Sequence, residues 1–542
     1  MRALLHTIGG FGKDRRGNIA IIFAFALLPA MSAVGCAVDY SMASRIKAKL
    51  QSAADAASIA AIAQKSPGYI AAAKMTSDGA VPDAVTDAYN ILDGNMKAVT
   101  GYANLSRNGT VTKTGIKLAS RSDFSADVPV TFLKLLGYRN ISVAGSASST
   151  ASLPPYLDFY LLLDVSGSMG LPSTTAEAAR LQQISPDNFI QYPTGCTLAC
   201  HFAPQNSACV DPGKSGATQG YPTNGYCLGY AISRVSPSKF QNLLVLQNPQ
   251  GKYTYQNSNP QSANYRQYQQ LPSSMVSGLP GSLNTDPTYG LSAASSCPTD
   301  GTDDCIQLRL DAVGNAVNDL FKTANSSMRV ANQFRIGLYP FITDIDRNYA
   351  PLTSSINGSS STPGTINYAA AQLATQLDIN LNANLGSGGT HIDDALYSLN
   401  GLIQTVGDGT SSTNTKPFVF LVTDGAQDNQ YKEVPNGSWH GSNHATVLDD
   451  TINDYPDIRT TMTKRQIIVA VLYIPYQKIN PVNTSFAGNE DTYANNNIDN
   501  ISSSLKACAS PGFFYTANTP ADITAALNAM FSQSLVTAHI TN

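Results

Sequence analysis

The chain has 542 residues, with 34 Lys and Arg against 37 Asp and Glu, which leaves a formal net charge of −3. Because there is no basic excess to neutralise phosphates, the composition argues against a nucleic-acid-binding protein. Hydrophobic residues make up 43% of the chain, so it can bury real cores, and its length indicates several domains. A polytopic membrane protein is excluded, since a single long apolar run stands out.

That apolar run spans residues 19–38 and carries no charge. It has the roughly 20 residues that a helix needs to cross a hydrocarbon core. Basic residues precede it, so the positive-inside rule predicts that residues 1–18 are cytoplasmic and that the rest of the chain lies outside. A cleaved export signal, or a lipoprotein signal at Cys36, is the alternative. The Ala-rich helical pattern continues through residues 39–64 without a break, which favours an uncleaved anchor.

Cysteine usage agrees with export. Six cysteines fall in one Gly-, Pro- and Tyr-rich stretch: Cys196, Cys200, Cys209, Cys227, Cys297 and Cys305. Outside the cytoplasm such a cluster predicts a disulfide framework, whose connectivity the sequence leaves open. Zinc is the alternative, because Cys196, Cys200 and His201 form a ligand-like group, although no second paired cluster completes a tetrahedral site. Cys508 stands alone, and we expect it to be buried near the last strand, either free or paired.

Residues 67–151 leave the Ala-rich pattern for short segments in which apolar and polar residues alternate. Such alternation is typical of half-buried antiparallel strands. We therefore expect a stalk helix and a small α+β module over residues 39–155, with a boundary at Pro154-Pro155. The module has no cluster of His, Cys or acidic residues, so we interpret it as a non-catalytic spacer.

From residue 156 to residue 542, apolar runs alternate with helical patterns, which is typical of a parallel sheet covered on both faces. The expected strands are YLDFYLLL ending at Leu163, FRIGLYPF from Phe334, PFVFLV from Pro417, QIIVAVLYI from Gln466 and GFFYT from Gly512. Helical patterns begin at Cys305 and after Thr390, and another closes the chain. The predicted fold class is α/β, with a doubly wound, mostly parallel, Rossmann-like sheet.

Oxygen-bearing side chains gather where these strands end, which is where such sheets bind ligands. Asp164, Ser166 and Ser168 follow the first strand, Thr390 precedes a helix, and Asp424 follows a later strand. A set of carboxylates and hydroxyls without His or Cys points to Mg²⁺, Mn²⁺ or Ca²⁺ rather than zinc or copper. The simpler alternative is a turn with serine caps and an ordinary Asp-Gly turn.

The motifs DVSGSM, SGGT and LVTDG contain these residues in this order and resemble the metal-ion-dependent adhesion site of von Willebrand factor type A domains. The resemblance implies that Ser166, Ser168 and Thr390 ligate the metal directly. It also implies that Asp164 and Asp424 act largely through water. The sixth position would be left for an acidic group of a protein partner.

The chain departs from that family at one place. In the family the first metal-binding loop leads directly into its helix. Here an insertion of about residues 171–304 separates that loop from the helix, which is far longer than an ordinary loop. The clustered cysteines lie in this insertion or at its end. We expect it to emerge beside the metal, where it would shape partner choice or occlude the site.

The segment RRGNIAIIFAFALLPAMSAVGCAVDYSMASRIKAKLQSAADAASIAAIA resembles the N-terminal segment of TadG-like proteins of the bacterial Tad (Flp) pilus-assembly system. An anchor, a small α+β module and a C-terminal von Willebrand A domain form the architecture of that family. The resemblance implies a single-pass protein of the bacterial inner membrane, with a cytoplasmic N-terminus and most of the chain in the periplasm. Related pseudopilins carry Glu at the fifth position after a processed Gly, whereas Gly17 is followed at that spacing by Ile22.

These observations favour a membrane-anchored, non-enzymatic component of Tad/Flp-type pilus assembly or anchoring. It would contact the membrane through residues 19–38 and bind an acidic group on a pilus or envelope protein through the metal. A surface adhesin that uses the same site on an external ligand is the alternative. A metal-dependent hydrolase is disfavoured, because no nucleophile elbow surrounds Ser166 or Ser168 and no general base is evident.

Overall fold

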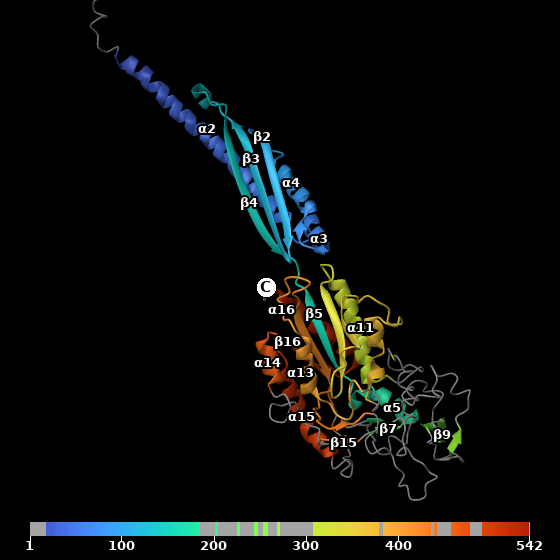
Figure 1. The fold of residues 1–542 in the computed structure, drawn as a ribbon. Helices are drawn as coiled ribbons and strands as arrows, with labels where there is room; N and C mark the ends of the chain where they lie inside the picture. The colour runs from blue at the N-terminus through green and yellow to red at the C-terminus, as the bar shows by residue number, and fades with distance from the viewer. Residues whose placement is uncertain are drawn as a thin grey trace, which may run out of the picture. The chain divides into compact units, whose positions relative to one another are not determined.

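The computed structural model divides the chain into two compact units, whose elements Figure 1 shows. The N-terminal unit comprises Met1–Pro154 with Arg329–Ala331, and the C-terminal unit comprises Pro155–Met328 with Asn332–Asn542. The structure describes residues 18–184, 201–203, 225–227, 243–247, 253–257, 268–270, 297, 307–378, 383–434, 438–441, 457–476, 478 and 490–540.

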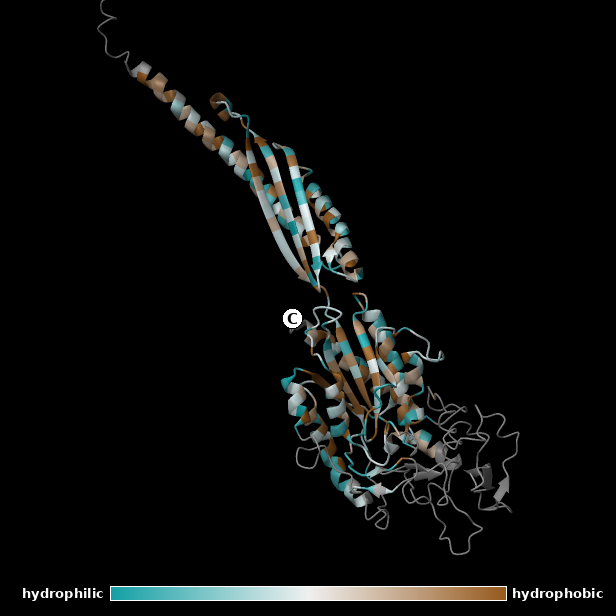
Figure 2. Ribbon diagram, in the orientation of Figure 1, coloured by the Kyte–Doolittle hydropathy of each residue, from teal (hydrophilic) through white to brown (hydrophobic). Residues whose placement is uncertain are grey.

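The N-terminal unit begins with one helix of 43 residues, α2 (Asn18–Ala60). Its first half exposes large apolar side chains, among them Phe23, Phe25 and Met31, and Figure 2 shows this half largely in the hydrophobic colours. Among the described residues it is the one helix long and apolar enough to cross a membrane, with a mean hydropathy of 1.8. The prediction of one apolar helix near the N-terminus is confirmed.

The second half of α2 packs on a sheet. It buries small and branched side chains at helical spacing, namely Ala43, Ile46, Leu50, Ala53, Ala54 and Ala57. Polar contacts fix the same face, because Gln51 Nε2 donates to the carbonyl of Ser146 at 2.9 Å and Ser58 Oγ lies 2.8 Å from Ser149 Oγ. The helix therefore runs from the apolar segment into the core of this unit without a break.

The sheet of the N-terminal unit has four antiparallel strands in the order β1-β2-β3-β4. They are β1 (Gly79–Ala80), β2 (Ala103–Thr114), β3 (Lys117–Pro129) and β4 (Asn140–Ser152). The shorter helices are α3 (Pro67–Lys74), α4 (Pro82–Met96) and the 3₁₀ turn η2 (Leu133–Leu136). Along β3, buried residues alternate with exposed or half-buried ones, as a strand with one covered face requires.

The C-terminal unit is built on a six-stranded sheet in the order β12-β11-β5-β13-β16-β17. Its strands are β5 (Leu157–Asp164), β11 (Phe334–Phe341), β12 (Ala350–Thr353), β13 (Lys416–Thr423), β16 (Ile468–Tyr473) and β17 (Phe514–Thr516). All neighbours are parallel except β12, which pairs antiparallel with β11. The prediction of an α/β fold with a mostly parallel sheet is confirmed. The chain reverses its direction of winding between the adjacent strands β5 and β13.

Helices cover both faces of this sheet, and each face has its own core. One face carries α11 (Arg309–Ser327), α12 (Ile366–Ala371), η4 (Leu373–Gln376) and α16 (Pro520–Ile540). The other carries α13 (Ile392–Leu402), α14 (Ile458–Lys464) and α15 (Glu490–Cys508). Every residue of β5 is buried, which explains the apolar run of residues 159–163 within it. Cys508 is buried in the second core, close to the last strand as expected.

The remaining described elements belong to short sheets and turns. They are η3 (Gly167–Gly170), α5 (Thr175–Ile184), β6 (His201–Ala203), β7 (Gly225–Cys227), β8 (Leu243–Gln247), β9 (Tyr253–Asn257), β10 (Tyr268–Gln270), β14 (Tyr431–Lys432) and β15 (Trp439–His440). β6 and β7 are parallel, whereas β8, β9 and β10 form an antiparallel sheet.

The two ends of the predicted insertion lie side by side. Ser173 N donates to the carbonyl of Gln307 and Arg309 N donates to that of Leu171, each at 2.9 Å. The helix expected from Cys305 begins at Arg309, because the side chain of Asp311 accepts the amide of Leu308 and caps it there.

Cys297 is disulfide-bonded. Cys196, Cys200, Cys209 and Cys305 lie outside the described residues, and of Cys227 the structure describes the backbone. The disulfide framework as a whole stays a prediction.

Phe159 is the centre of the first core, where four other phenylalanine rings surround it at centroid distances of 5.2–6.1 Å. We expect Phe159→Ala to lower the free energy of unfolding of the C-terminal unit by about 3–5 kcal/mol, because a close-packed interior does not refill the cavity. Urea unfolding of the detergent-solubilised full-length protein measures this. The control is Val536→Ala at an exposed position of α16, with an effect within about 0.5 kcal/mol. Equal midpoints for the two variants would contradict the assignment of the core.

Candidate metal-binding site

The predicted carboxylates meet at the point where the sheet reverses its winding. Asp164 is the last residue of β5, and Asp424 directly follows β13, the neighbouring strand. Thr423 Oγ1 donates to Asp164 Oδ2 at 2.6 Å and so ties the two strand ends together. Asp164 is 1% exposed and Asp424 is fully buried.

The two predicted serines lie on the loop that follows β5. Ser166 N donates to Asp164 Oδ1 at 2.9 Å, and the hydroxyls of Ser166 and Ser168 lie 3.3 Å apart. Ser168 also forms a side-chain hydrogen bond with Asp424. Four of the five predicted residues are therefore brought together by hydrogen bonds.

Burial dominates the electrostatics of the two carboxyl groups. Desolvation, with the charge of Asp424, raises the pKa of Asp164 to about 7, although hydrogen bonds from Ser166 and Thr423 work against it. Desolvation likewise raises the pKa of Asp424, although the charge of Arg309 and hydrogen bonds from Tyr476 and Ser168 act to lower it. The protein thus holds two like charges out of water with incomplete compensation.

One oxygen of this pair has no hydrogen-bond partner. Oδ1 of Asp424 is one of three buried side-chain oxygens in the described part of the chain for which this is so. A buried carboxylate oxygen left in this way is costly unless a cation or a water satisfies it. Among the described residues no group of three His, Cys, Asp or Glu side chains could hold a metal, so any ion here depends on the hydroxyls as well. The donor set fits a hard divalent cation.

Thr390 approaches from a separate loop. It is 6% exposed and exchanges two backbone hydrogen bonds with Asp428, of 3.0 and 2.9 Å. Gly389 allows this approach, because an added Cβ would lie 2.0 Å from the carbonyl oxygen of Gln430. Among the described contacts, the hydroxyl of Thr390 has no hydrogen bond to the carboxylate pair. Direct ligation by Thr390 stays a prediction.

A buried aspartate that the sequence analysis missed connects this loop to the serine loop. Asp378 accepts hydrogen bonds from Ser387 Oγ at 2.6 Å and from Gly388 N at 2.8 Å. Its own amide donates to the carbonyl of Val165 at 3.0 Å. Nothing in the motif spacing singles Asp378 out, since it lies in an irregular segment after η4.

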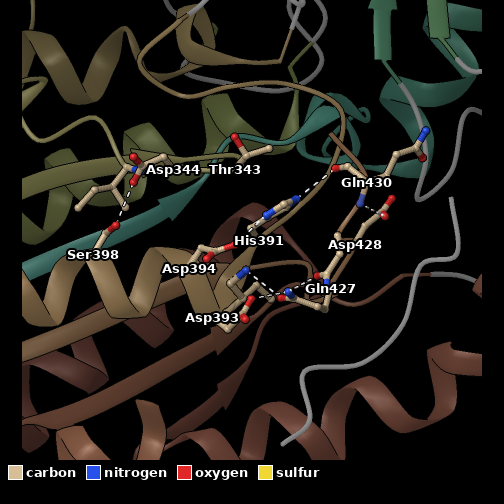
Figure 3. Close-up of polar contacts among 12 residues, drawn as sticks. Thr343, Asp344, His391, Asp393, Asp394, Ser398, Gln427, Asp428 and Gln430 are labelled. Atoms are coloured by element: carbon tan, nitrogen blue, oxygen red, sulfur yellow. Dashed lines mark hydrogen bonds and ion pairs between the residues drawn. The ribbon is translucent and has the colours of Figure 1, made fainter. Parts of the chain in front are cut away.

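Behind Thr390, a polar network holds the start of α13, as Figure 3 shows. His391 Nδ1 lies 2.8 Å from Asp394 Oδ2, and its Nε2 lies 3.1 Å from the carbonyl oxygen of Gln430. Desolvation lowers the pKa of His391, but these two contacts outweigh it and raise the pKa. Gln427 donates to Asp393 Oδ1 at 2.5 Å and accepts the amide of Ile392 at 2.8 Å. These residues position the loop and do not themselves contact the carboxylate pair in the described contacts.

Arg309, the first residue of α11, is the second residue that the sequence analysis missed. Its Nη1 lies 3.5 Å from Asp424 Oδ2, and its Nη2 donates to the carbonyl of Pro475 at 3.3 Å. The guanidinium lies over the ring of Tyr476, 5.5 Å from the centroid. Arg309 therefore places a cation beside Asp424 and compensates part of its charge.

Residues 17–73 match a family model described as putative Flp pilus-assembly TadE/G-like. The match covers α2 and nearly all of α3, and it confirms the TadE/TadG-like resemblance of the N-terminal segment. No curated protein matches the sequence of the chain.

Similar solved structures include pilus proteins at low identity. The SpaC pilus adhesin of Lactobacillus rhamnosus GG in its open conformation aligns at 11% identity and a TM-score of 0.30, over 80% of this chain and 34% of that chain. The vWF domain of the type V pili tip protein Mfa5 from Porphyromonas gingivalis aligns at 12% identity and a TM-score of 0.26. The alignment covers 42% of this chain and 89% of that chain. A variant of the PilB minor pilin from Streptococcus sanguinis aligns at 9% identity and a TM-score of 0.29, over 82% of this chain and 82% of that chain. The chain spans about a third of the length of SpaC, and similarity at these TM-scores supports no conclusion about function.

The raised pKa of Asp164 predicts a pH dependence in the metal-free protein. A carboxyl whose pKa rises from 3.8 to about 7 on folding binds more protons in the folded state across that range. Stability should therefore fall as the pH rises from about 4 to about 7. In EDTA, we expect the thermal midpoint to fall by a few degrees over this range, followed by the fluorescence of Trp439, the single tryptophan.

The matched variants are Asp164→Asn, which removes the titrating group, and Asp319→Asn, which alters a carboxylate that is 45% exposed on α11. Asp164→Asn should flatten the slope relative to wild type, and Asp319→Asn should leave it unchanged. An identical slope in all three proteins would show that Asp164 titrates normally.

Proposed function

We propose that this chain is a membrane-anchored, non-enzymatic component of Tad/Flp-type pilus assembly or anchoring, which binds a protein partner through a divalent-metal site in a von Willebrand A-type C-terminal unit. The TadE/G-like match of residues 17–73 and the single apolar helix support the pilus and membrane parts of this proposal. The observation that carries the metal part is the buried carboxylate pair with its unpartnered oxygen on Asp424.

Each residue of the proposed site has a distinct task. Ser166, Ser168 and Thr390 would supply neutral oxygens, and Asp164 and Asp424 would supply charge, partly through water. A bound Mg²⁺, Mn²⁺ or Ca²⁺ would offer residual positive charge to which an acidic side chain of a partner can bind. Because the hydroxyls are neutral, the chain leaves that charge uncancelled.

The residues give no support to catalysis. The serines next to Asp164 have no histidine among their described contacts, and His391 is engaged with Asp394 and Gln430 instead. Binding a carboxylate needs no nucleophile or general base. A pilus or envelope protein is the proposed partner, and a surface adhesin with an external ligand would use the same chemistry at a different location.

The insertion begins and ends next to the proposed site. Leu171 and Arg309 are joined by a backbone hydrogen bond, and Arg309 in turn lies against Asp424. We propose that the six clustered cysteines staple the insertion and that it contributes to partner choice, because a chain entering and leaving at this edge borders the metal.

Metal binding should stabilise the folded protein. Mg²⁺ at a hundred times its dissociation constant should add about 2.7 kcal/mol to the free energy of unfolding if the unfolded chain does not bind it. Asp164→Ala should abolish this shift without unfolding the unit, because the apolar sheet stays intact, whereas Asp319→Ala should keep it. Thermal unfolding with and without Mg²⁺ is the measurement. A wild type that gains nothing from Mg²⁺, Mn²⁺ or Ca²⁺ would remove the basis of the metal proposal.

The same variants test partner binding in cells. Cross-linking followed by pull-down of the full-length protein should recover a pilus or envelope protein from wild type and from Asp319→Ala, and lose it with Asp164→Ala or with EDTA. Recovery that is equal in all samples would place the contact elsewhere on the chain.

The proposed topology puts the N-terminus in the cytoplasm and the bulk of the chain in the periplasm. A periplasm-active reporter fused after Ala151 should be active, while the full-length protein stays in the inner-membrane fraction. A soluble exported form with its N-terminus near Cys36 or Asp39 would contradict the uncleaved anchor.

A further inference from the structure

The connection between β3 and β4, residues 130–139, exposes large apolar side chains. Phe132 is 40% exposed, Leu135 80%, Leu136 54% and Tyr138 62%. These residues lie in or next to the turn η2. Gly137 ends this turn in the left-handed region, with a φ of 89°. A cluster of this kind on a soluble surface would be an unfavourable contact with water. We call residues 130–139 the β3–β4 tip.

The tip is fastened to α2 at the end of the apolar run. Asp39 is 2% exposed, and its carboxylate accepts the amides of Thr131, Phe132 and Leu133 at 2.9, 2.8 and 2.7 Å. Desolvation raises the pKa of Asp39, but these three bonds and the charge of Lys134 outweigh it and lower the pKa. A charged carboxylate therefore holds the start of the tip at neutral pH.

The tip also contacts the apolar run itself. A Cβ added to Gly35 would lie 2.4 Å from Cβ of Phe132, so the helix has a glycine where this ring packs. Gly35 precedes Asp39 by one helical turn, about 6 Å along the axis. Phe132 therefore packs beside the end of the apolar segment that the proposed anchor would place in the bilayer. Figure 1 shows the connection between β3 and β4 beside α2, and Figure 2 shows hydrophobic colours on both of these segments.

The chemistry of the tip suits the boundary between lipid tails and headgroups. Leucine and phenylalanine partition into the acyl region, tyrosine prefers the interface, and Lys134 and Arg139 carry the charge that anionic headgroups attract. A protein partner would also cover apolar residues, but the position of the tip beside Gly35 puts lipid next to it once α2 spans a membrane.

We propose that the β3–β4 tip is a second membrane contact, inserted into the interface of the leaflet in which the apolar part of α2 ends. The proposal rests on the membrane anchor of the proposed function. A helix and a tip joined at Asp39 and Gly35 would fix the rotation of α2 and hold the N-terminal unit at the membrane surface by two points, where a lone helix would allow it to swivel.

A tryptophan placed on the tip reports its depth. In a Trp439→Phe background, Leu135→Trp puts a single indole at a position that is already 80% exposed, so the fold should tolerate it. The full-length protein is reconstituted in phosphatidylethanolamine and phosphatidylglycerol vesicles, with or without lipids brominated on the acyl chain near the headgroup. We expect emission at shorter wavelength than in water and at least about twofold weaker with the brominated lipid, since an interfacial residue lies within reach of shallow quenchers.

Two matched variants separate the tip from the anchor. Phe25→Trp, 75% exposed on the apolar half of α2, should be quenched by deeply brominated lipids. Ile70→Trp, 46% exposed on α3, should emit as in water and remain unquenched. If Phe25→Trp is quenched and Leu135→Trp is not, the anchor stands and the tip proposal is wrong. Short-wavelength emission without quenching would assign the tip to a contact with a second copy of this chain and would overturn the lipid proposal.

The other two combinations of quenching results decide between the anchor and the tip as well. If neither Phe25→Trp nor Leu135→Trp is quenched, the anchor and the tip proposal both fail. If Leu135→Trp alone is quenched, the tip binds the membrane and the transmembrane assignment of α2 is overturned.

Discussion

Two carboxylates kept out of water at the ends of adjacent strands constrain the whole C-terminal unit. β5 and β13 are the central strands of the sheet, and every residue of β5 is buried, so Asp164 and Asp424 end their strands in a dry environment. Neither charge can be tolerated there without donors or cations. The surrounding sequence is organised to supply them: Thr423 and Ser166 donate to Asp164, and Arg309 approaches Asp424.

The compensation is incomplete, and the proposed metal site depends on that incompleteness. Hydrogen bonds from hydroxyls and amides favour the charged carboxylates but do not neutralise them, so the pKa of Asp164 is still raised to about 7. A site built only for stability would pair each acid fully or replace it by an apolar residue. Oδ1 of Asp424 has no hydrogen-bond partner in the described part of the chain, and a cation at the proposed site would satisfy it.

The sequence predicts the parts of this arrangement that depend on local patterns. Continuous apolar runs identify the buried strands, and Asp164, Ser166 and Ser168 follow from the position directly after one of them. It misses β12, because a four-residue antiparallel edge strand has too short a pattern to recognise. It also misses Asp378 and Arg309, whose partners lie far away in the sequence and which only the folded loops bring to the site. The alternation of apolar and polar residues also predicts a strand through residues 127–136, whereas β3 ends at Pro129 and Leu133–Leu136 form the 3₁₀ turn η2.

Arg309 gives the site a property that the motif alone does not contain. It is the first residue of α11, and its amide is bonded to Leu171, where the insertion begins. The guanidinium is thus held from three sides, by Asp424, the carbonyl of Pro475 and the ring of Tyr476. A contact of 3.5 Å is long for an ion pair, so a small displacement of this helix start changes how much of the charge of Asp424 is compensated. Leu171, where the predicted insertion begins, is thus hydrogen-bonded to the residue whose guanidinium lies 3.5 Å from Asp424 Oδ2.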